Sequence, residues 1–350
     1  MLSVYTLDDA EKWDTIVRSF KDYDVYWLSD YVKSFQIHGD GDSMLFYCED
    51  GSNRGINVVM KRDIAKDSFF CGKIEENHWF DFATPYGYGG WMIEGDQVQK
   101  LFRTYFDWME SNHIICEFVR FHPLLRNHEA CEDFYEVVRL GEVVHMDLSS
   151  SEVIWNNLTS ENRNRIRKAE KNQVRVYYDS FPGIAEHFRA VYTATMDRKN
   201  ADSYYYFDSA FFQSVLKNLA QNCRIFRAEK DGKLVAASMM IFANGHMSFH
   251  LSGCLEEYSA LAPNNLIMYS AALWGCENGY KTLLLGGGVG SRADTLLRYK
   301  KTFYKGGLNH FYIGKKIIHP GKYYELSRLG KATESPYFPQ YRTKACYRDI

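Results

Sequence analysis

The sequence predicts an α/β (α+β) protein with two tandem domains, each a mixed, largely antiparallel sheet flanked by helices. Three observations lead to this fold class. The chain has 350 residues, which is more than a single hydrophobic core usually holds. Turn dipeptides such as Asp50-Gly51 and Asn244-Gly245 join alternating apolar runs and indicate hairpins. The same order of strands and helices occurs twice, which indicates a tandem repeat.

The first copy of this order is predicted to fill residues 1–150. Hydrophobic periodicity and turn signals give its elements in chain order: strands over 43–49 and 55–62, a helix over 96–112, a strand over 114–121, a short helical piece after Pro123, and a strand over 142–148.

The second copy is predicted over 151–318 and begins with a basic helix. Its further elements are a helix around 212–219, strands over 224–229, 234–242 and 246–252, a helix over 264–277, a strand over 280–285, a helix over 294–304, and a strand over 308–314. The dipeptide Asn278-Gly279 is typical of a left-handed helix cap. Residues 319–350 are expected to form an irregular, Tyr-rich tail.

The overall charge disfavours a protein that attracts polyanions through its net field. The formal net charge is −2 and the pI is near 6.6, so a phosphate-rich ligand needs a local basic patch. Eight Cys occur without a C-x-x-C pair or zinc spacing, which predicts reduced thiols. Because no leader peptide and no apolar run of membrane-spanning length is visible, we expect a cytoplasmic protein without an integral membrane segment.

Residues 163–171 concentrate positive charge, since five of these nine residues are Arg or Lys. On a helix, Arg163, Arg167 and Lys171 form one stripe beside a narrow apolar face. Guanidinium and ammonium groups in this arrangement suit a ligand rich in phosphate. A solvated charge run, balanced by two neighbouring Glu residues, is the alternative interpretation.

This basic helix, preceded by Trp155, resembles the segment that opens the second domain in the FemABX family of peptidoglycan aminoacyltransferases. The motifs Leu285-Gly286-Gly287 and Tyr299-Lys300-x-x-Phe303 carry the same resemblance. Residues 81–90 and 117–125 look like segments of a wider set of FemAB-like proteins linked to cell-wall or surface-polysaccharide synthesis. The resemblance implies two tandem GNAT-like acyltransferase domains. It also implies transfer of an aminoacyl group from aminoacyl-tRNA to an amine of a cell-wall precursor, without a further cofactor.

Lys300 is the catalytic residue that the resemblance implies. Attack of an amine on an ester passes through an oxyanion, and a cation beside that oxygen lowers the barrier. In the family pattern the lysine that follows an aromatic residue has this role, and Tyr299-Lys300 matches the pair. Lys301 points about 100° away on a helix, so only one of the two lysines can face a substrate. A surface lysine is the alternative interpretation of Lys300.

The resemblance also implies substrate-binding residues. Arg198 and Tyr205 resemble the segment that holds the acceptor, and His250 falls near a substrate-binding tyrosine of the family. A tyrosine cluster and a strand histidine more often belong to a core, so both interpretations stay open. Phosphates of the donor or the acceptor would meet the basic helix through Arg163, Arg167, Lys168 and Lys171.

Two glycine-rich loops are further candidates. In 285–292, Gly287 would let a substrate pass close to the backbone and Arg292 could meet a phosphate, but a flexible turn fits equally well. In the first domain, Tyr86 and Tyr88 lie among glycines and form either a pocket wall or a structural turn. The sequence shows no Ser-His-Asp or Cys-His order and no cluster of metal ligands, so we expect no metal.

The identity of the donor is open. Acetyl-CoA enzymes bind pyrophosphate with R/Q-x-x-G-x-G/A between a strand and a helix, and the corresponding residues 253–264 have no glycine after the first. The extended coiled-coil arm of many FemABX proteins is absent from 181–222 as well. Aminoacyl-tRNA is the first hypothesis. An acyl-CoA-dependent N-acyltransferase acting on a surface-polysaccharide or nucleotide-sugar amine is the alternative, and a non-catalytic module that recognises RNA or a glycan is the third.

Overall fold

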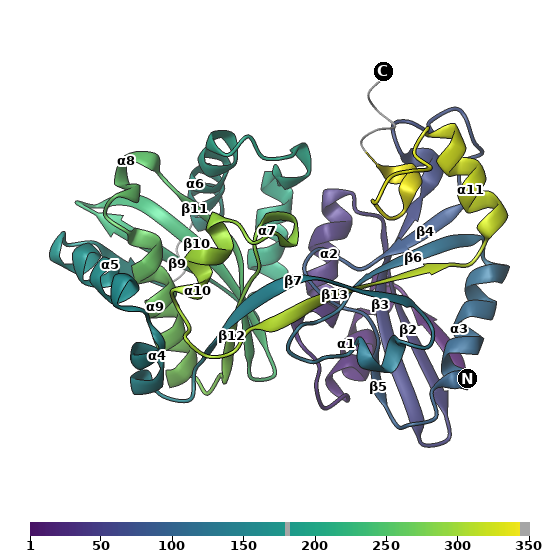
Figure 1. The fold of residues 1–350 in the computed structure, drawn as a ribbon, viewed down its shortest axis with the longest axis horizontal. Helices are drawn as coiled ribbons and strands as arrows, with labels where there is room; N and C mark the ends of the chain where they lie inside the picture. The colour runs from purple at the N-terminus through teal and green to yellow at the C-terminus, as the bar shows by residue number, and fades with distance from the viewer. Residues whose placement is uncertain (179–182, 344–350) are drawn as a thin grey trace. The chain divides into compact units, whose positions relative to one another are not determined.

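The computed structural model describes residues 1–178 and 183–343, which divide into two compact units (Figure 1). Unit 1 contains Met1–Leu140 and the residues from Tyr312 on, and unit 2 contains Gly141–Phe311. The chain leaves unit 1 within strand β7 (Glu136–Asp147) and returns to it within strand β13 (Asn309–Ile317).

Unit 1 has a mixed sheet with the strand order β1-β2-β3-β4-β6-β13, and β5 pairs with β3. Only β4 and β6 pair in parallel among these described strands. Its other elements, with their bounds, are β1 (Leu2–Tyr5), α1 (Ala10–Arg18), α2 (Ser29–His38), β2 (Asp42–Asp50), β3 (Asn53–Asp63), β4 (Phe80–Ala83), β5 (Met92–Glu94), α3 (Gln99–Ser111), β6 (Ile114–Arg120) and α11 (Pro320–Leu329).

Unit 2 has a sheet with the strand order β8-β9-β10-β11-β12-β7, in which β11 and β12 are the parallel pair. Its other elements are α4 (Ser151–Asn157), α5 (Ser160–Lys171), β8 (Arg175–Tyr177), α6 (Ile184–Arg198), α7 (Ser209–Asn218), β9 (Cys223–Lys230), β10 (Lys233–Ala243), β11 (His246–Cys254), α8 (Glu256–Ser259), α9 (Pro263–Glu277), β12 (Thr282–Gly286) and α10 (Thr295–Lys301).

The two sheets repeat one plan, with an exchange of the last strand. Strands β2-β3-β4-β6 correspond in order and direction to β9-β10-β11-β12. The strand that then follows in the chain, β7, pairs with β12 of unit 2, whereas β13 pairs with β6 of unit 1. The predicted fold class, two tandem copies of a mixed and largely antiparallel sheet, is confirmed. Because of this exchange, the residues from Tyr312 on belong to unit 1, and a single boundary near residue 150 does not separate the two units.

The sheet of unit 2 carries helices on both faces. On one face α9 packs on β9 and β10 beside α4 and α5, around a core that includes Phe226 and Met240. Helix α6 covers the other face, where a Cβ on Gly253 would lie 2.4 Å from the carbonyl oxygen of Val191. The next residue, Cys254, belongs to the α9 core, as the alternation of side chains along a strand requires. Only glycine at 253 permits this close approach.

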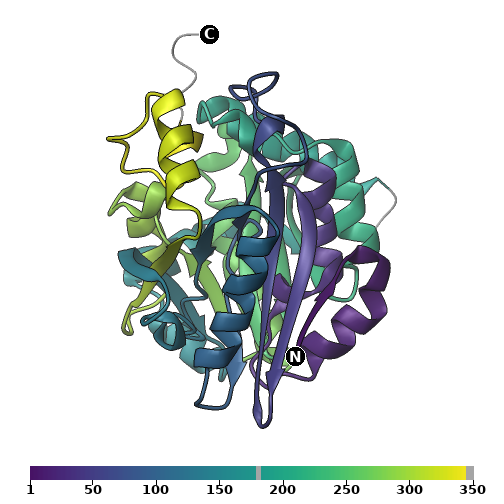
Figure 2. The same cartoon turned by 90° about the vertical axis from the view of Figure 1, so that its right-hand side faces the viewer.

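Two of the apolar clusters among the described residues of unit 1 matter for its fold. Helix α3 packs on its sheet (Figure 2), and Phe102 and Tyr105 meet Phe46 of β2 and neighbouring core residues there. The second cluster joins Tyr323 of α11 and Tyr341 to residues of β6 and the loop after β3. The segment expected to be an irregular tail therefore starts with a helix, and its aromatic residues complete the core of unit 1.

Most predicted elements are confirmed within a few residues. The 43–62 hairpin is β2 and β3, the 96–112 helix is α3, and the 264–277 helix is α9, which Gly279 ends with a φ of 80°. The piece after Pro123 is a single 3-10 turn, Glu129–Cys131. Helices α1, α2, α4, α6 and α11 were not predicted. Cys346 lies outside the described residues. Among the residues that the structure describes, no helix is long and apolar enough to span a membrane.

Candidate active site

Lys300 lies in the last turn of α10 and is buried. Its side chain is among the charged groups least accessible to solvent, with 7% of the residue exposed. The Nζ atom donates a hydrogen bond of 2.7 Å to the carbonyl oxygen of Gly287. Burial lowers the pKa of Lys300 to about 8, while the charge of Asp294 acts in the opposite direction. At pH 7 about nine tenths of these amines still carry a proton, so Lys300 is a partly desolvated cation.

The side chain of Lys301 points away from that of Lys300, as expected for adjacent residues of a helix. Its Nζ lies 2.8 Å from Glu142 Oε2, and 39% of its side chain is exposed. The structure thus separates the two neighbouring lysines into one buried ammonium and one exposed ion pair. Lys301 supplies a matched control for any experiment on Lys300.

The glycine loop between β12 and α10 packs closely on other backbone. A Cβ on Gly287 would lie 2.7 Å from the carbonyl oxygen of Glu142. Arg292 is exposed, and its guanidinium makes no ion pair within the described chain. The loop thus presents a carbonyl to Lys300 and an arginine to solvent.

Tyr299 lies in the core of unit 2. Its ring packs edge-to-face on Phe303, with the centroids 5.2 Å apart. Its buried hydroxyl has no hydrogen-bond partner among the described residues, and burial raises its pKa. The structure therefore gives Tyr299 a packing role behind Lys300.

The basic helix α5 uses its cations in different ways. Arg163 Nη1 donates to the carbonyl oxygens of Leu158 (2.8 Å) and Trp155 (3.4 Å), and so closes the end of α4. Arg165 pairs with Glu161 at 2.9 Å.

The cations of α5 that face solvent are a smaller set than the sequence predicted. The Arg167 guanidinium lies 5.3 Å from the centre of the Trp155 ring. Lys168 and Lys171 are exposed and form no ion pair in the described part of the chain. The accessible basic patch, defined as Arg167, Lys168 and Lys171, therefore lacks Arg163, whose guanidinium bonds to backbone instead.

The predicted acceptor residues lie on α6, the loop after it and β11. Arg198 Nη1 donates to the carbonyl oxygen of Cys254 at 2.9 Å, which ties the end of α6 to the end of β11. Tyr205 is exposed and packs edge-to-face on Tyr204. Desolvation lowers the pKa of His250 to about 3, so its imidazole is neutral at pH 7. Arg198 on α6 thus contacts the end of β11, the strand that carries His250.

Tyr86 and Tyr88 belong to unit 1, in the loop that follows β4. Tyr31 donates its hydroxyl hydrogen to the Tyr86 carbonyl, and Arg120 Nε donates to the Gly87 carbonyl at 3.0 Å. Tyr88 packs edge-to-face on Tyr26, and burial raises its pKa to about 12. The loop is therefore held in a defined conformation by an aromatic cluster and Arg120.

A buried Asp24–His122 pair supports this loop and was not predicted. Asp24 Oδ2 lies 3.0 Å from His122 Nε2. The backbone N–H groups of Leu124 and Leu125 both donate to Nδ1, so the ring proton sits on Nε2 and points to Asp24. His122 was not among the candidate residues that the sequence indicated. Asp24 is 98 residues away, and no local spacing could reveal it.

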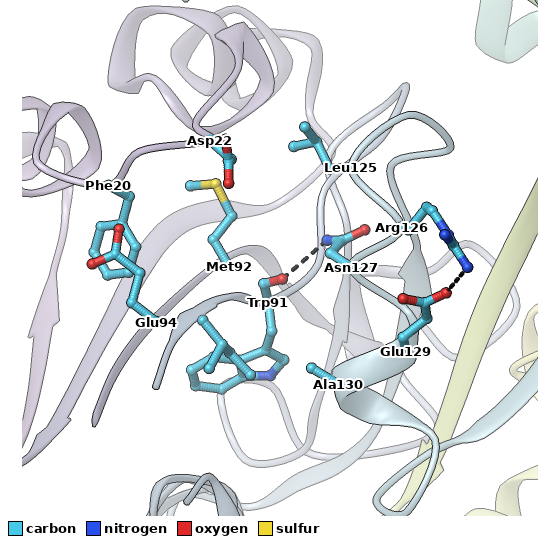
Figure 3. Close-up of a pocket in the computed structure, with 11 residues that line it drawn as sticks. Phe20, Asp22, Trp91, Met92, Glu94, Leu125, Arg126, Asn127, Glu129 and Ala130 are labelled. Atoms are coloured by element: carbon cyan, nitrogen blue, oxygen red, sulfur yellow. Dashed lines mark hydrogen bonds and ion pairs between the residues drawn. The ribbon is translucent and has the colours of Figure 1, made fainter. Parts of the chain in front are cut away.

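A cavity of about 230 Å³ in unit 1 contains none of the predicted residues (Figure 3). Its lining includes Trp91 and Met92, together with Arg126 and Glu129, which form an ion pair. Asn127 donates to the Trp91 carbonyl at 3.0 Å. Among all the residues that the structure describes, no three His, Cys, Asp or Glu side chains lie together as a group that could bind a metal ion.

The comparisons with known proteins agree with this architecture. Residues 158–301, within unit 2, match the family described as an acetyltransferase (GNAT) domain. The chain is similar to the crystal structure of FemX, with a TM-score of 0.69 and 11% identity over 93% of this chain and 99% of that one. It is also similar to L-PGS from Bacillus licheniformis, with a TM-score of 0.56 and 16% identity over 87% of this chain and 91% of that one. No curated protein matches the sequence.

The domain match defines the class of this part of the protein: residues 158–301 form an acyltransferase domain of the GNAT type. The fold of the chain is similar to that of FemX, so the predicted resemblance to the FemABX family is confirmed in the fold. At 11% identity the likeness concerns the fold, and the donor and the acceptor are matters for the following proposal.

Proposed function

We propose that the protein transfers an aminoacyl group from aminoacyl-tRNA to an amine of a peptidoglycan precursor, in the cytoplasm. The observation that carries the proposal is the buried Lys300 ammonium, held 2.7 Å from the Gly287 carbonyl. It lies in the unit that matches an acyltransferase family. A desolvated cation in such a unit suits the stabilisation of an oxyanion.

The reaction needs no covalent enzyme intermediate. The acceptor amine attacks the ester carbonyl of the donor, a C–N bond forms, and the carbonyl oxygen becomes an oxyanion. Lys300 donates a hydrogen bond to that oxygen. When the oxyanion collapses, the C–O bond to the tRNA ribose breaks, and the proton that the attacking nitrogen gives up passes to the ribose oxygen. One well-placed donor of this kind lowers the activation free energy by about 3–4 kcal/mol.

The other candidates divide between donor and acceptor. The accessible basic patch on α5 would contact phosphates of the tRNA, with Arg292 as a further cation. Arg198, Tyr205 and His250 would hold the acceptor. In this proposal Arg163 and Tyr299 act indirectly, because their groups are engaged or buried within unit 2.

The test is an acyl-transfer assay with purified protein, aminoacyl-tRNA and a peptidoglycan precursor. Replacement of Lys300 by Met should lower kcat by about 10²- to 10³-fold, while the matched Lys301→Met variant should keep its rate within about twofold. Equal rates for both variants and the unaltered protein would remove the proposed mechanism.

An acyl-CoA donor is the second candidate, because the matching family is described as an acetyltransferase domain. One contact speaks against it. The first turn of α9, where acetyl-CoA enzymes bind pyrophosphate, is covered by α5: Asn265 Nδ2 donates to Asn162 Oδ1 at 2.9 Å, and both side chains are buried. Thermal shifts would separate the donors, since a ligand at 100 times its Kd adds about 2.7 kcal/mol. A shift with CoA and none with aminoacyl-tRNA would favour the second candidate.

A further inference from the structure

The carboxylate of Asp294 joins the glycine loop to helix α10. Its Oδ1 accepts a hydrogen bond of 2.9 Å from the N–H of Leu297 and caps the helix. Its Oδ2 accepts a second bond, also 2.9 Å, from the N–H of Val289 in the loop. One side chain therefore fixes two segments relative to each other.

The same two segments hold Lys300. Its Nζ bonds to the carbonyl of Gly287, two residues before the loop N–H that Asp294 accepts. A Cβ on Gly288 would lie 2.4 Å from Asp294 Oδ1, so the carboxylate packs directly on the loop backbone. The position of the Gly287 carbonyl, and with it the Lys300 ammonium, depends on Asp294.

Among the charged groups near Lys300, Asp294 is the one whose charge affects the pKa of the lysine. Lys301, its neighbour on α10, is neutralised by Glu142 of β7. Arg292, from the loop, is exposed and directs its guanidinium toward Gly290. The charge of Asp294 opposes the effect of burial and favours the protonated amine. Asp294 thus influences both the place and the charge of Lys300.

We propose that Asp294 is a positioning residue for Lys300: by tying the glycine loop to α10 it places the ammonium where the oxyanion forms. This inference rests on the proposed function, in which Lys300 acts on the oxyanion. Asp294 touches neither substrate in this scheme, and it acts only through the loop and the lysine.

A titration of the free protein tests the inference without any substrate. Asn and Ser cap helices about as well as Asp, so Asp294→Asn and Asp294→Ser keep α10 capped but remove the charge. By NMR of the lysine side chains, with Lys300 assigned from a Lys300→Arg variant, its titration midpoint should fall by about half a pH unit in both. Asp208 caps α7 in the same way, through Phe211 N at 2.8 Å. Asp208→Ser should leave the midpoint unchanged, and an unchanged midpoint in the Asp294 variants would overturn the inference.

Acyl-transfer kinetics supply the second readout. In the Asp294 variants the fall of kcat at high pH should move to lower pH with the titration, and kcat should drop about tenfold or more, with the KM for aminoacyl-tRNA unchanged. A raised KM with an unaltered pH profile would mean that Asp294 acts only as a structural cap. If the unaltered protein transfers no acyl group while the NMR midpoint still moves, the proposed function fails and the placement of Lys300 by Asp294 stands.

Discussion

Units 1 and 2 share a strand order but differ in how far backbone hydrogen bonds continue along their parallel strand pair. In unit 1 the pairing continues beyond β4, because Thr84 N and Gly89 N donate to the carbonyls of Phe118 and Arg120 at 3.0 and 2.8 Å. In unit 2 the pairing of β11 with β12 ends at Ser248 and Leu284. The two units thus have the same strand order, but the hydrogen bonding between the parallel strands continues past the end of the first strand in unit 1 and stops earlier in unit 2.

The buried charges differ in the same sense. In unit 1, Asp81 accepts hydrogen bonds from Arg62 Nε and Arg342 Nε, both at 2.6 Å. In unit 2, Lys300 meets a neutral carbonyl instead of a carboxylate. A buried charge with its partners is satisfied within the fold, and removal of one partner is strongly destabilising, whereas a desolvated charge without a counter-ion is a candidate for a reaction. The comparison therefore contrasts the paired buried charge of Asp81 in unit 1 with the buried ammonium of Lys300 in unit 2.

The largest expected effect on folding comes from the paired charge of unit 1. Asp81→Ala would leave two guanidinium groups facing a buried site without their carboxylate, and should cost unit 1 about 3–5 kcal/mol. Urea unfolding followed by hydrogen exchange of β4 and β6 peptides would measure this loss. Asp50→Ala is the control, since it breaks the exposed Lys100–Asp50 pair and should cost less than about 1 kcal/mol. A similar loss in both variants would break the comparison.

Glu117 should make the stability of unit 1 depend on pH. It is buried beside Tyr135 and Asn57, and burial raises its pKa from 4.5 to about 7. Because the folded state holds this proton more tightly than the unfolded chain, the stability is full below pH 4.5 and falls as the pH rises to 7, by roughly 3 kcal/mol. Glu117→Gln should flatten this slope in urea titrations at several pH values. A slope that survives the substitution would point to another group.

The stability of unit 2 should change with pH in the opposite direction, and at higher pH than that of unit 1. Burial lowers the pKa of Lys300 from 10.5 to about 8, so the unfolded chain binds this proton more tightly. The stability of unit 2 should then rise between pH 8 and 10.5, by roughly 3 kcal/mol. Lys300→Met should abolish the rise, and Lys301→Met should retain it. If Lys301 carried the effect, the contrast between a buried and an exposed lysine would be refuted.

The order of elements could be predicted because it depends on local signals. Apolar periodicity marks α3 and α9, and Asn-Gly and Asp-Gly dipeptides mark the hairpins. The exchange of β7 and β13 could not be predicted, because the choice between two similar sheets depends on contacts between distant residues. The same reason hides α11, whose Tyr323 finds its partners in a core formed by the first half of the chain.

The candidate site was predicted unevenly. The different directions of Lys300 and Lys301 follow from the helical spacing of two adjacent residues, but which of the two is buried does not. The roles of Arg163 and Asp294 do not, because each depends on carbonyl or N–H groups that are unsatisfied only once a helix end has formed. Sequence spacing shows which charges share a helix face, but it does not show which of them the backbone already uses.

The smallest effects are expected from single residues of the accessible basic patch. If tRNA phosphates contact Arg167, Lys168 and Lys171, each change to Gln should weaken binding modestly and reduce the slope of log K against log salt by about 1. Arg165→Gln is the matched control on the same helix, because its guanidinium already pairs with Glu161. Filter binding of aminoacyl-tRNA at several salt concentrations gives both quantities. If Arg165→Gln changed the slope as much as the other three, the patch would act as a diffuse charge, and the distinction between paired and available cations that separates the two units would not extend to α5.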